Sequence, residues 1–166
     1  MPIVDYPDPY GECENALKAV LLEITDYFEN EWQVSNNDTN IARGGENFIV
    51  LRPGSFPIAD EFQTGQIKDY DWSVTMDLYV RYTEYEESWN QFKAVRAAMI
   101  WKLSTNPLLK CTVEPAKSAK NVWRVALASD ESAQYFKFSE TPDEATPSFI
   151  IQTMSVTIRQ RVEFPF

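Results

Sequence analysis

Hydrophobic residues recur along the chain with two different periods, and each period predicts a type of secondary structure. Between about residues 12 and 31 they fall three or four positions apart, as on one face of a helix. These positions are Ala16, Leu17, Val20, Leu21, Ile24, Tyr27 and Phe28. A second helix is predicted after residues 83–86, which have the spacing of a capping box. Its apolar positions are Trp89, Phe92, Val95, Met99, Ile100 and Leu103, and Asn106 and Pro107 end it.

Alternation of apolar and polar residues predicts two long strands, at residues 70–82 and 149–164. One face of the first carries Trp72, Val74, Met76, Leu78, Val80 and Tyr82. One face of the second carries Ile150, Met154, Val156, Ile158, Val162 and Phe164, and Gln152 and Gln160 interrupt it. We expect the two strands to lie in one sheet, with their apolar faces towards the helices. Their other faces would then form a continuous surface of Thr, Ser, Arg and Asp.

The remaining segments complete an α+β fold. Residues 48–51 predict a short buried strand, and residues 122–129 and 134–139 predict a hairpin. Residues 35–45, 55–68 and 141–147 are predicted loops, because they are rich in turn-forming residues or lack a period. Strands that two helices interrupt, without βαβ alternation, favour a mainly antiparallel sheet with two amphipathic helices packed on one face. We expect residues 1–11 to be an extended arm and residues 12–166 to be a single domain.

Composition agrees with one globular domain. The chain has 166 residues, of which 44% are hydrophobic and 24% charged, close to the averages of soluble globular proteins. Aromatic residues make up 14%, and Tyr and Trp are enriched where surfaces are buried against partners. Cys13 and Cys111 are expected to be small buried residues without a disulfide.

Net charge and hydropathy limit the partners. The formal charge of -10 repels phosphate backbones, so wrapping of nucleic acid is not expected. No stretch is long and apolar enough for a membrane span, and the N-terminus lacks the pattern of a signal peptide. The sequence therefore predicts a protein that is made and used in the cytoplasm.

Residues that carry catalytic chemistry are missing or have a structural explanation. The chain has no histidine, which excludes Ser-His-Asp and Cys-His catalysis and most zinc sites. Gly44 and Gly45 lack the frame of a phosphate-binding loop. We therefore expect neither an enzyme nor a bound cofactor or metal.

Two acidic or polar clusters leave other interpretations open. Glu84, Glu86 and Glu87, or Asp143 and Glu144, could form a glycosidase-like pair, but acidic residues in the first turn of a helix are explained by its dipole. Residues 36–40 carry oxygen ligands for calcium, but they lack the spacing and terminal Glu of an EF-hand. A plain turn is favoured there.

The polar faces of the two long strands contain the candidate subunit-interface residues. The candidates are Asp77, Tyr79, Arg81, Arg159 and Arg161, together with Arg43 and Phe56 in the two long loops. One interpretation is a solvated sheet surface on which Arg pairs with Asp77 and Glu163 across strands. The other is a contact between subunits, because Arg and Tyr are enriched in interfaces. Strands of roughly 13 and 16 residues exceed the usual length of about 5 to 6, which favours a neighbouring subunit that covers them.

The order of these elements resembles that of the tail terminator, or tail completion, proteins of long-tailed bacteriophages. The elements are a helix containing residues 16–22, a loop, a strand at 48–52, a strand at 71–80, a second helix, a hairpin, and a final strand containing residues 154–159. The resemblance covers about residues 12–164 and is architectural, because the family has no diagnostic motif. No functional residue is therefore transferred.

The resemblance implies a homo-oligomeric ring in the virion, usually of six copies and assembled in the host cytoplasm. Such a ring caps the tail tube, stops its polymerisation and meets the neck or connector protein, and double-stranded DNA passes through its lumen without specific binding. Another neck or head-tail adaptor protein is the nearest alternative. A module that binds a small molecule or peptide, with aromatic residues lining a pocket, is an alternative from a different class. An enzyme that uses Glu84 or Asp143 is the last.

Overall fold

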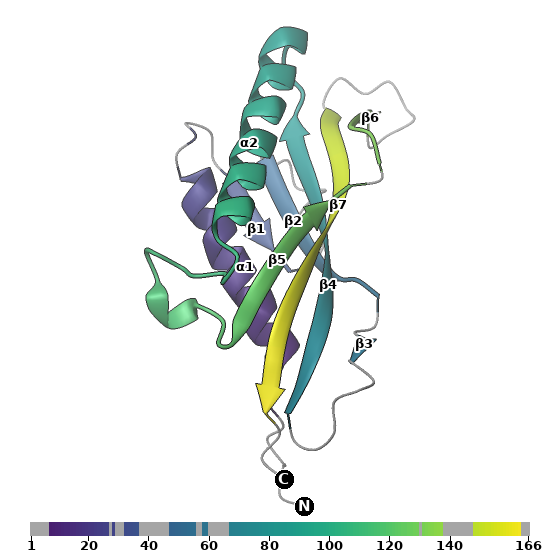
Figure 1. Cartoon of the computed structure of the whole chain (residues 1–166). Coiled ribbons are helices and arrows are strands. Elements are labelled where there is room, and N and C mark those ends of the chain that lie inside the picture. The colour runs from purple at the N-terminus through teal and green to yellow at the C-terminus, as the bar shows by residue number, and fades with distance from the viewer. Residues whose placement is uncertain are drawn as a thin grey trace, which may run out of the picture.

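The computed structural model describes residues 7–26, 28, 32–36, 47–55, 58–59, 67–129, 131–137 and 148–163. Two long helices lie on one side of a seven-stranded sheet (Figure 1). The helices are α1 (Pro9–Thr25) and α2 (Tyr85–Thr105), followed by a short 3-10 helix, η2 (Pro115–Lys117). The strands are β1 (Trp32–Ser35), β2 (Asn47–Pro53), β3 (Ile58–Ala59), β4 (Ile67–Arg81), β5 (Val122–Ala128), β6 (Gln134–Lys137) and β7 (Ser148–Glu163). The predicted α+β class is confirmed.

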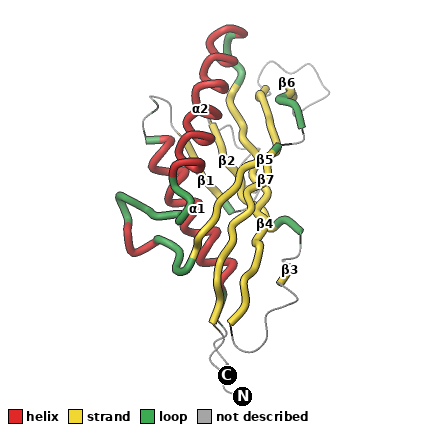
Figure 2. Tube along the Cα trace, in the orientation of Figure 1, coloured by secondary structure: helices red, strands yellow, loops and turns green. Residues whose placement is uncertain are grey.

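The sheet has the strand order β1-β2-β4-β7-β5, with β3 paired to β4 and β6 paired to β7 (Figure 2). All these pairs are antiparallel except β1 and β2, which run parallel from the pair Trp32 and Asn47 onwards. Sequence reasoning missed β1 and β3, because strands of four and two residues are too short to show a period.

The two predicted long strands are adjacent and form the centre of the sheet. All fifteen residues of β4 pair with β7, from Ile67 opposite Glu163 to Arg81 opposite Phe149. Side chains alternate along a strand, so this register places even-numbered residues of both strands on the same face. The expectation that both strands share one sheet is confirmed.

The even-numbered face of β4 and β7 packs against both helices and forms the main core. The strand residues in this core include Val74, Met76, Leu78, Val80, Ile150, Val156 and Ile158, and the helix residues include Leu17, Leu21, Phe92, Val95 and Met99. All of these side chains are at most 1% exposed. Ile100, which was predicted to lie on the same stripe of α2, is instead 48% exposed.

Helix α1 begins earlier and ends earlier than predicted. The Asp8 side chain accepts a hydrogen bond from the Gly11 N–H at 2.9 Å and caps the helix, with Pro9 in its first turn. Residues 9–11 are therefore helical and are not part of an extended arm, while residues 1–6 lie outside the described part. The helix ends at Thr25, six residues before the predicted end at Glu31.

Helix α2 starts where expected, but a different side chain caps it. Glu84 is the N-cap residue and makes no capping hydrogen bond with its side chain. Instead, the Ser88 hydroxyl accepts hydrogen bonds from the N–H groups of Thr83 at 3.0 Å and Glu84 at 3.3 Å. The prediction of a capping box was therefore wrong about which side chain makes the capping hydrogen bonds. No helix in the described ranges combines the length and apolar character needed to cross a membrane.

The predicted hairpin does not form, because β5 and β6 each pair with β7. Strand β5 pairs with residues 155–160 of β7, and β6 pairs with residues 148–151. A sixteen-residue strand is long enough to hold two short partners on one edge. Gln152 fixes the link between them, since its side-chain amide donates to the Glu131 carbonyl at 2.9 Å and the Ser129 hydroxyl at 3.2 Å.

Gln160, the second polar residue on the apolar face, holds the other end of β5. It is 3% exposed. Its side-chain oxygen accepts from Trp72 Nε1 at 3.0 Å, and its amide donates to the Lys120 carbonyl at 2.9 Å. The segment that leads into β5 is thereby tied to the lower end of β4.

Glu23 connects α1 to the segment between α2 and β5. Its carboxylate accepts from the Thr112 N–H at 2.7 Å, the Thr112 hydroxyl at 2.9 Å and the Val113 N–H at 2.9 Å. Lys102 of α2 lies 3.5 Å away. Burial raises the pKa of Glu23, but the hydrogen bonds from Val113 and Thr112 and the charge of Lys102 together lower it below its usual value.

Replacing Gln160 by Leu should destabilise the fold. The substitution keeps the size of the side chain but leaves Trp72 Nε1 and the Lys120 carbonyl without a partner, at a cost of about 2 to 4 kcal/mol in the free energy of unfolding. Urea denaturation measures this loss. Thr157→Val is the control, because Thr157 is exposed on the other face of the same strand, and it should change the free energy by less than about 0.5 kcal/mol. Equal effects of the two substitutions would contradict the role of Gln160.

Glu23→Gln should destabilise the protein at neutral pH and much less in acid. A carboxylate whose pKa is lower in the folded state stabilises the fold above its unfolded pKa, near 4.5, and this contribution is lost as the pH falls through the folded pKa. We expect the free energy of unfolding of the wild type to exceed that of the variant by about 1 to 3 kcal/mol at a pH of about 7. Urea denaturation from a pH of about 7 to about 3 should show this difference shrinking. A difference that stays constant over this range contradicts the assignment.

Candidate subunit interface on the outer face of the sheet

The predicted interface residues on β4 and β7 share the face of the sheet that points away from both helices. We call this the outer face; it holds the odd-numbered residues of β4 and β7 and the even-numbered residues of β2. The candidates found on it are Asp77, Tyr79, Arg81, Arg159 and Arg161. Arg43 and Phe56 lie outside the described residues.

One half of the outer face carries two ion pairs across β4 and β7. Asp69 lies opposite Arg161, and the guanidinium donates two hydrogen bonds to its carboxylate, at 2.9 and 3.1 Å. Asp71 lies opposite Arg159, with 3.6 Å between Arg159 Nε and the carboxylate. The hydrogen bonds from Arg161 to Asp69 raise the pKa of Arg161. Arg residues do pair across the strands, and Asp69 and Asp71 are partners that were not predicted. Of the two predicted partners, Asp77 pairs with an Arg of β2, and the charge of Glu163 acts on Arg161 and raises its pKa further.

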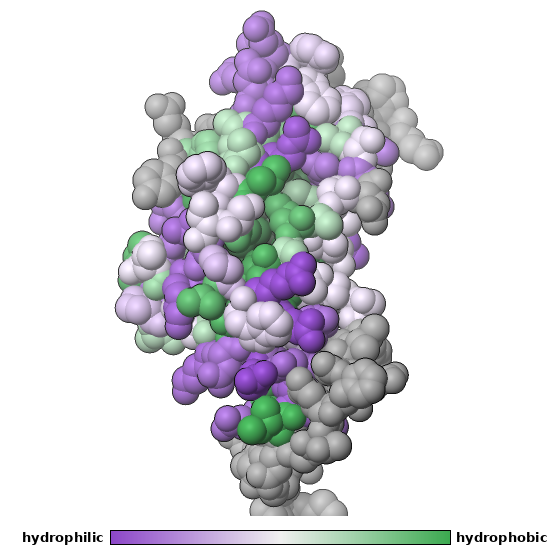
Figure 3. Space-filling view, in the orientation of Figure 1, coloured by the Kyte–Doolittle hydropathy of each residue, from purple (hydrophilic) through white to green (hydrophobic). Residues whose placement is uncertain are grey.

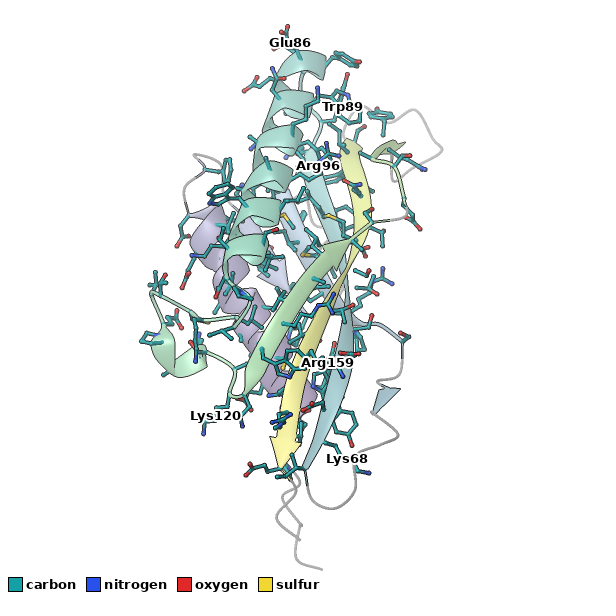
Figure 4. All side chains as sticks on the ribbon, in the orientation of Figure 1. Lys68, Glu86, Trp89, Arg96, Lys120 and Arg159 are labelled. Atoms are coloured by element: carbon teal, nitrogen blue, oxygen red, sulfur yellow. The ribbon has the colours of Figure 1, made fainter. Side chains whose placement is uncertain are left out.

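Arg159 also contacts an aromatic side chain on β5. Its guanidinium lies 4.9 Å from the centre of the Trp123 ring, within the range of a cation-π interaction. Trp123 sits where the register of β5 against β7 shifts, between Val122 and Arg124, and it is 46% exposed. Figure 4 labels Arg159 on the lower half of β7, beside β5. Sequence reasoning did not single out Trp123, because a shift in register has no signal in the hydrophobic period.

Asp77 marks the middle of the outer face and is 5% exposed. It accepts from Arg52 on β2 at 2.7 Å and from the Thr153 hydroxyl on β7 at 2.8 Å. Its carboxylate therefore joins three neighbouring strands within one subunit. A neighbouring subunit could contact Arg52, whose side chain is 44% exposed, but Asp77 itself is covered.

The other half of the outer face is apolar, which corrects the prediction of a continuous polar surface. Phe48, Val50 and Phe149 form a second core cluster, with Tyr79 and Ile151 packed against it. The Tyr79 ring meets the Phe149 ring edge-on, with centroids 6.0 Å apart. Tyr79 is thus part of a packed cluster rather than a member of a polar row.

Arg81 lies at the end of β4 beside this cluster. Its backbone N–H donates to the Asn47 side chain at 3.0 Å, which fixes the last pair of β2 and β4. At the same end of the sheet, but on the helix side, the rings of Tyr82 and Tyr135 meet edge-on at 5.0 Å, and Tyr135 on β6 is 54% exposed. The five described candidates therefore fall into two groups. Asp77, Arg159 and Arg161 belong to the charged part of the outer face, and Tyr79 and Arg81 lie at its aromatic end.

The acidic and thiol groups considered from the sequence form no metal site in the described part of the chain. Within the described ranges, no three His, Cys, Asp or Glu residues are placed to hold a metal ion. Cys13 and Cys111 are free thiols, as expected, and both are buried. Burial raises the pKa of Cys13 to about 12, and the nearby charges of Glu12 and Asp8 add to this. Asp143, Glu144 and residues 37–40 lie outside the described part.

No protein-family model matches the chain, and no curated protein matches it significantly.

Phe149→Ala should show that the aromatic end of the outer face is a structural cluster. Phe149 is fully buried, so its removal leaves a cavity against Tyr79 and Phe48 and should cost about 3 to 5 kcal/mol. Ile151→Ala removes a partly buried member of the same cluster and should cost less. Thermal or urea denaturation of the two variants measures the difference. A loss below about 1 kcal/mol for Phe149→Ala would contradict this interpretation.

Proposed function

We propose that this protein is a structural subunit of a virion, a tail terminator that forms a ring on the tail tube of a long-tailed phage. The observation that carries the proposal is the fifteen-residue pairing of β4 with β7. Such a strand pair is far longer than the common strand of about 5 to 6 residues, and both described long helices lie on its other face. On the outer face, the side chains of Arg52 and Arg161 are 44% and 55% exposed, and these are the parts of it that we expect a neighbouring subunit to contact.

The surfaces expected to make the ring are the outer face and the edge of β5 that has no strand partner within the described residues. Strand β5 is the last strand in the sheet order, and its sequence, VWRVALA, holds one charged residue. An edge strand with so little charge and no proline favours pairing with another chain. Trp123 and Arg159 lie next to this edge, and residues of these types dominate interface energies. The proposal assigns no catalytic step and no cofactor.

The charge of the chain agrees with a channel through which DNA passes. Fifteen basic residues against twenty-five acidic ones give a subunit that repels phosphate, and a ring of six copies would multiply this charge. DNA would then cross the lumen without being held. The neck or connector protein on one side and the tail tube protein on the other are the proposed partners.

The test is assembly of the purified protein, alone and with tail tubes. Sedimentation and electron microscopy should find rings, with one ring at the end of each tube. The double substitution Trp123→Ser and Arg159→Ser should reduce assembly while leaving the monomer folded. The proposal fails if the wild type stays monomeric under both conditions.

Deletion of the gene separates the terminator from a neck or head-tail adaptor protein. Loss of a terminator should give tails of excess length, because nothing stops polymerisation of the tube. Loss of a neck protein should give tails of normal length that are not joined to heads. Electron microscopy of the deletion lysate distinguishes the two.

A peptide-binding module is a second candidate, and one observation favours it. An open groove of about 630 Å³ runs beside α2 and is lined mainly by apolar side chains. Among its walls are Ile24, Phe28, Ala98, Trp101 and Val113. Grooves of this volume and lining bind ligands in many proteins.

A further inference from the structure

One side of α2 carries a second row of residues, of which Ala98 alone packs against the main core. Glu87, Gln91, Ala94, Ala98 and Trp101 are separated by four, three, four and three positions, and all five line grooves beside the helix. The α2 residues buried in the core form a different row: Ser88, Phe92, Val95, Met99 and Leu103. Alternating steps of three and four form the contact seam of two packed helices. Helix α2 therefore has one seam that is filled and one that is open.

The open seam lies along two grooves that share Phe28 as a lining residue, and we call the two grooves together the trough. The groove of about 630 Å³ follows the C-terminal half of α2, and a second one, of about 600 Å³, follows the N-terminal half. Phe28 lines both. Since α2 has 21 residues and rises about 1.5 Å per residue, the trough is long enough for several helical turns.

Most of the walls of the C-terminal half of the trough are apolar, and its charged residues are Glu23, Asp26 and Lys102. Trp101 and Val113 stand on its rim, and each is 73% exposed. The wall between them contains Ile24 and Ala98. Large apolar side chains with this exposure are the anchors expected of a protein contact. The small side chains Ala94 and Ala98 in the seam let a second backbone come close.

The N-terminal half of the trough is acidic. Its walls carry Glu84, Glu86 and Glu87, with Asn90 and Gln91 between them. Figure 3 shows polar residues gathered at this end of α2, and Figure 4 labels Glu86 there. A binding partner that fills the trough has to bring apolar side chains to one end and positive charges to the other.

We propose that the trough binds an amphipathic helix of a different protein, antiparallel to α2, with apolar residues in its N-terminal half and Lys or Arg in its C-terminal half. The antiparallel direction follows from the helix dipoles, because the C-terminal end of a helix favours basic residues and is itself attracted to the N-terminal end of α2. Heptad spacing in the partner matches the spacing of the open seam.

The α2 helix of a second copy of this chain does not fit the trough. Two α2 helices in parallel would bring Glu86 and Glu87 against the same residues of the copy. In antiparallel orientation, the acidic end of each helix would meet the Trp101 end of the other. The basic residue among the described walls at that end is Lys102, which already lies 3.5 Å from the Glu23 carboxylate. Glu86 and Glu87 would therefore be buried against a cation that is already paired. The partner is therefore a protein with a basic segment. The trough lies on the helix side of the sheet, so the inference does not rest on the proposed ring.

The test uses two synthetic helical peptides and the full chain. The first peptide has Leu at heptad spacing in its N-terminal half and Lys in its C-terminal half; the second has Glu in place of each Lys. We expect the Lys peptide to bind at micromolar concentrations and the Glu peptide to bind at least about tenfold more weakly. Calorimetry measures both affinities, and a higher salt concentration should weaken binding of the Lys peptide.

Three variants locate the binding site. Trp101→Ser should weaken the Lys peptide by about tenfold or more, because it removes the apolar anchor. Glu87→Lys should weaken binding of the Lys peptide and strengthen binding of the Glu peptide. Ile100→Ser is the matched control, since Ile100 is 48% exposed and neighbours Trp101 but does not line the trough. It should bind like the wild type. Circular dichroism checks that each variant is folded.

Four results would overturn the proposal. Two concern the wild type: it fails to bind the Lys peptide below about 100 μM, or it binds the two peptides equally well. The other two concern the variants: Ile100→Ser loses as much binding as Trp101→Ser, or Trp101→Ser has no effect on binding. Sedimentation of the Trp101→Ser variant tests whether a second copy of the chain occupies the trough. If this substitution alone dissociates an oligomer of the wild type, the trough is a contact between copies of the chain and the proposal is wrong.

Discussion

The antiparallel register of β4 and β7 determines most of the architecture. It places the even-numbered residues of both strands on one face, and this face supplies the sheet side of the main core. The same register puts Asp69 opposite Arg161 and Asp71 opposite Arg159. A slip by one residue would turn Val74 and Met76 to solvent and bury Asp71 and Asp77 against the helices. Burial of apolar area on one face and ion pairing on the other therefore favour the same alignment.

The sequence predicted the elements well where a period extends over many residues. The alternation from residue 70 to 82 and the three-to-four spacing from Ala16 to Ile24 were enough to place β4 and most of α1, and with the second helix they led to the correct fold class. A period describes one element by itself, however, and pairing between elements is not contained in it. Residues 122–129 and 134–139 both look like strands, so a hairpin was the simplest prediction. Only the length of β7 allows both to lie on one of its edges.

The site was less predictable, because its contacts depend on register and on short elements. Asp77 was expected to pair with an Arg of the polar face, but its partner is Arg52 on β2, whose position relative to β4 no pattern reveals. A signal was available for the other two pairs: two Asp residues two positions apart, Asp69 and Asp71, match two Arg residues with the same spacing, Arg159 and Arg161. The aromatic cluster around Phe149 was missed, since Tyr79 was assigned to the polar face by alternation alone and Phe149 was assigned to neither face.

Three of the buried polar side chains, Glu23, Gln152 and Gln160, show how the fold chooses among similar arrangements. Each one interrupts an apolar surface and contacts both a connecting segment and a long element. The partners on the long elements are Lys102, Arg96 and Trp72. Apolar packing has little direction, so it would allow these connections to shift along the core. A buried amide or carboxylate is costly unless its particular partners are in place. The polar residues therefore set the positions of the connections, while the apolar residues supply most of the stability.

The same reasoning separates surfaces that are already satisfied from those that gain by a contact. Asp69, Asp77, Arg159 and Arg161 have partners within the subunit, so a neighbour that engages them must first compete with these pairs, and exposed ion pairs contribute little. Trp101 and Val113 expose apolar area that nothing in the described part of the chain covers. Burial of that area is favourable without breaking an existing contact. Exposed aromatic side chains, more than the rows of charge, should therefore provide the affinity of this protein for its partners, and the charges should set the orientation.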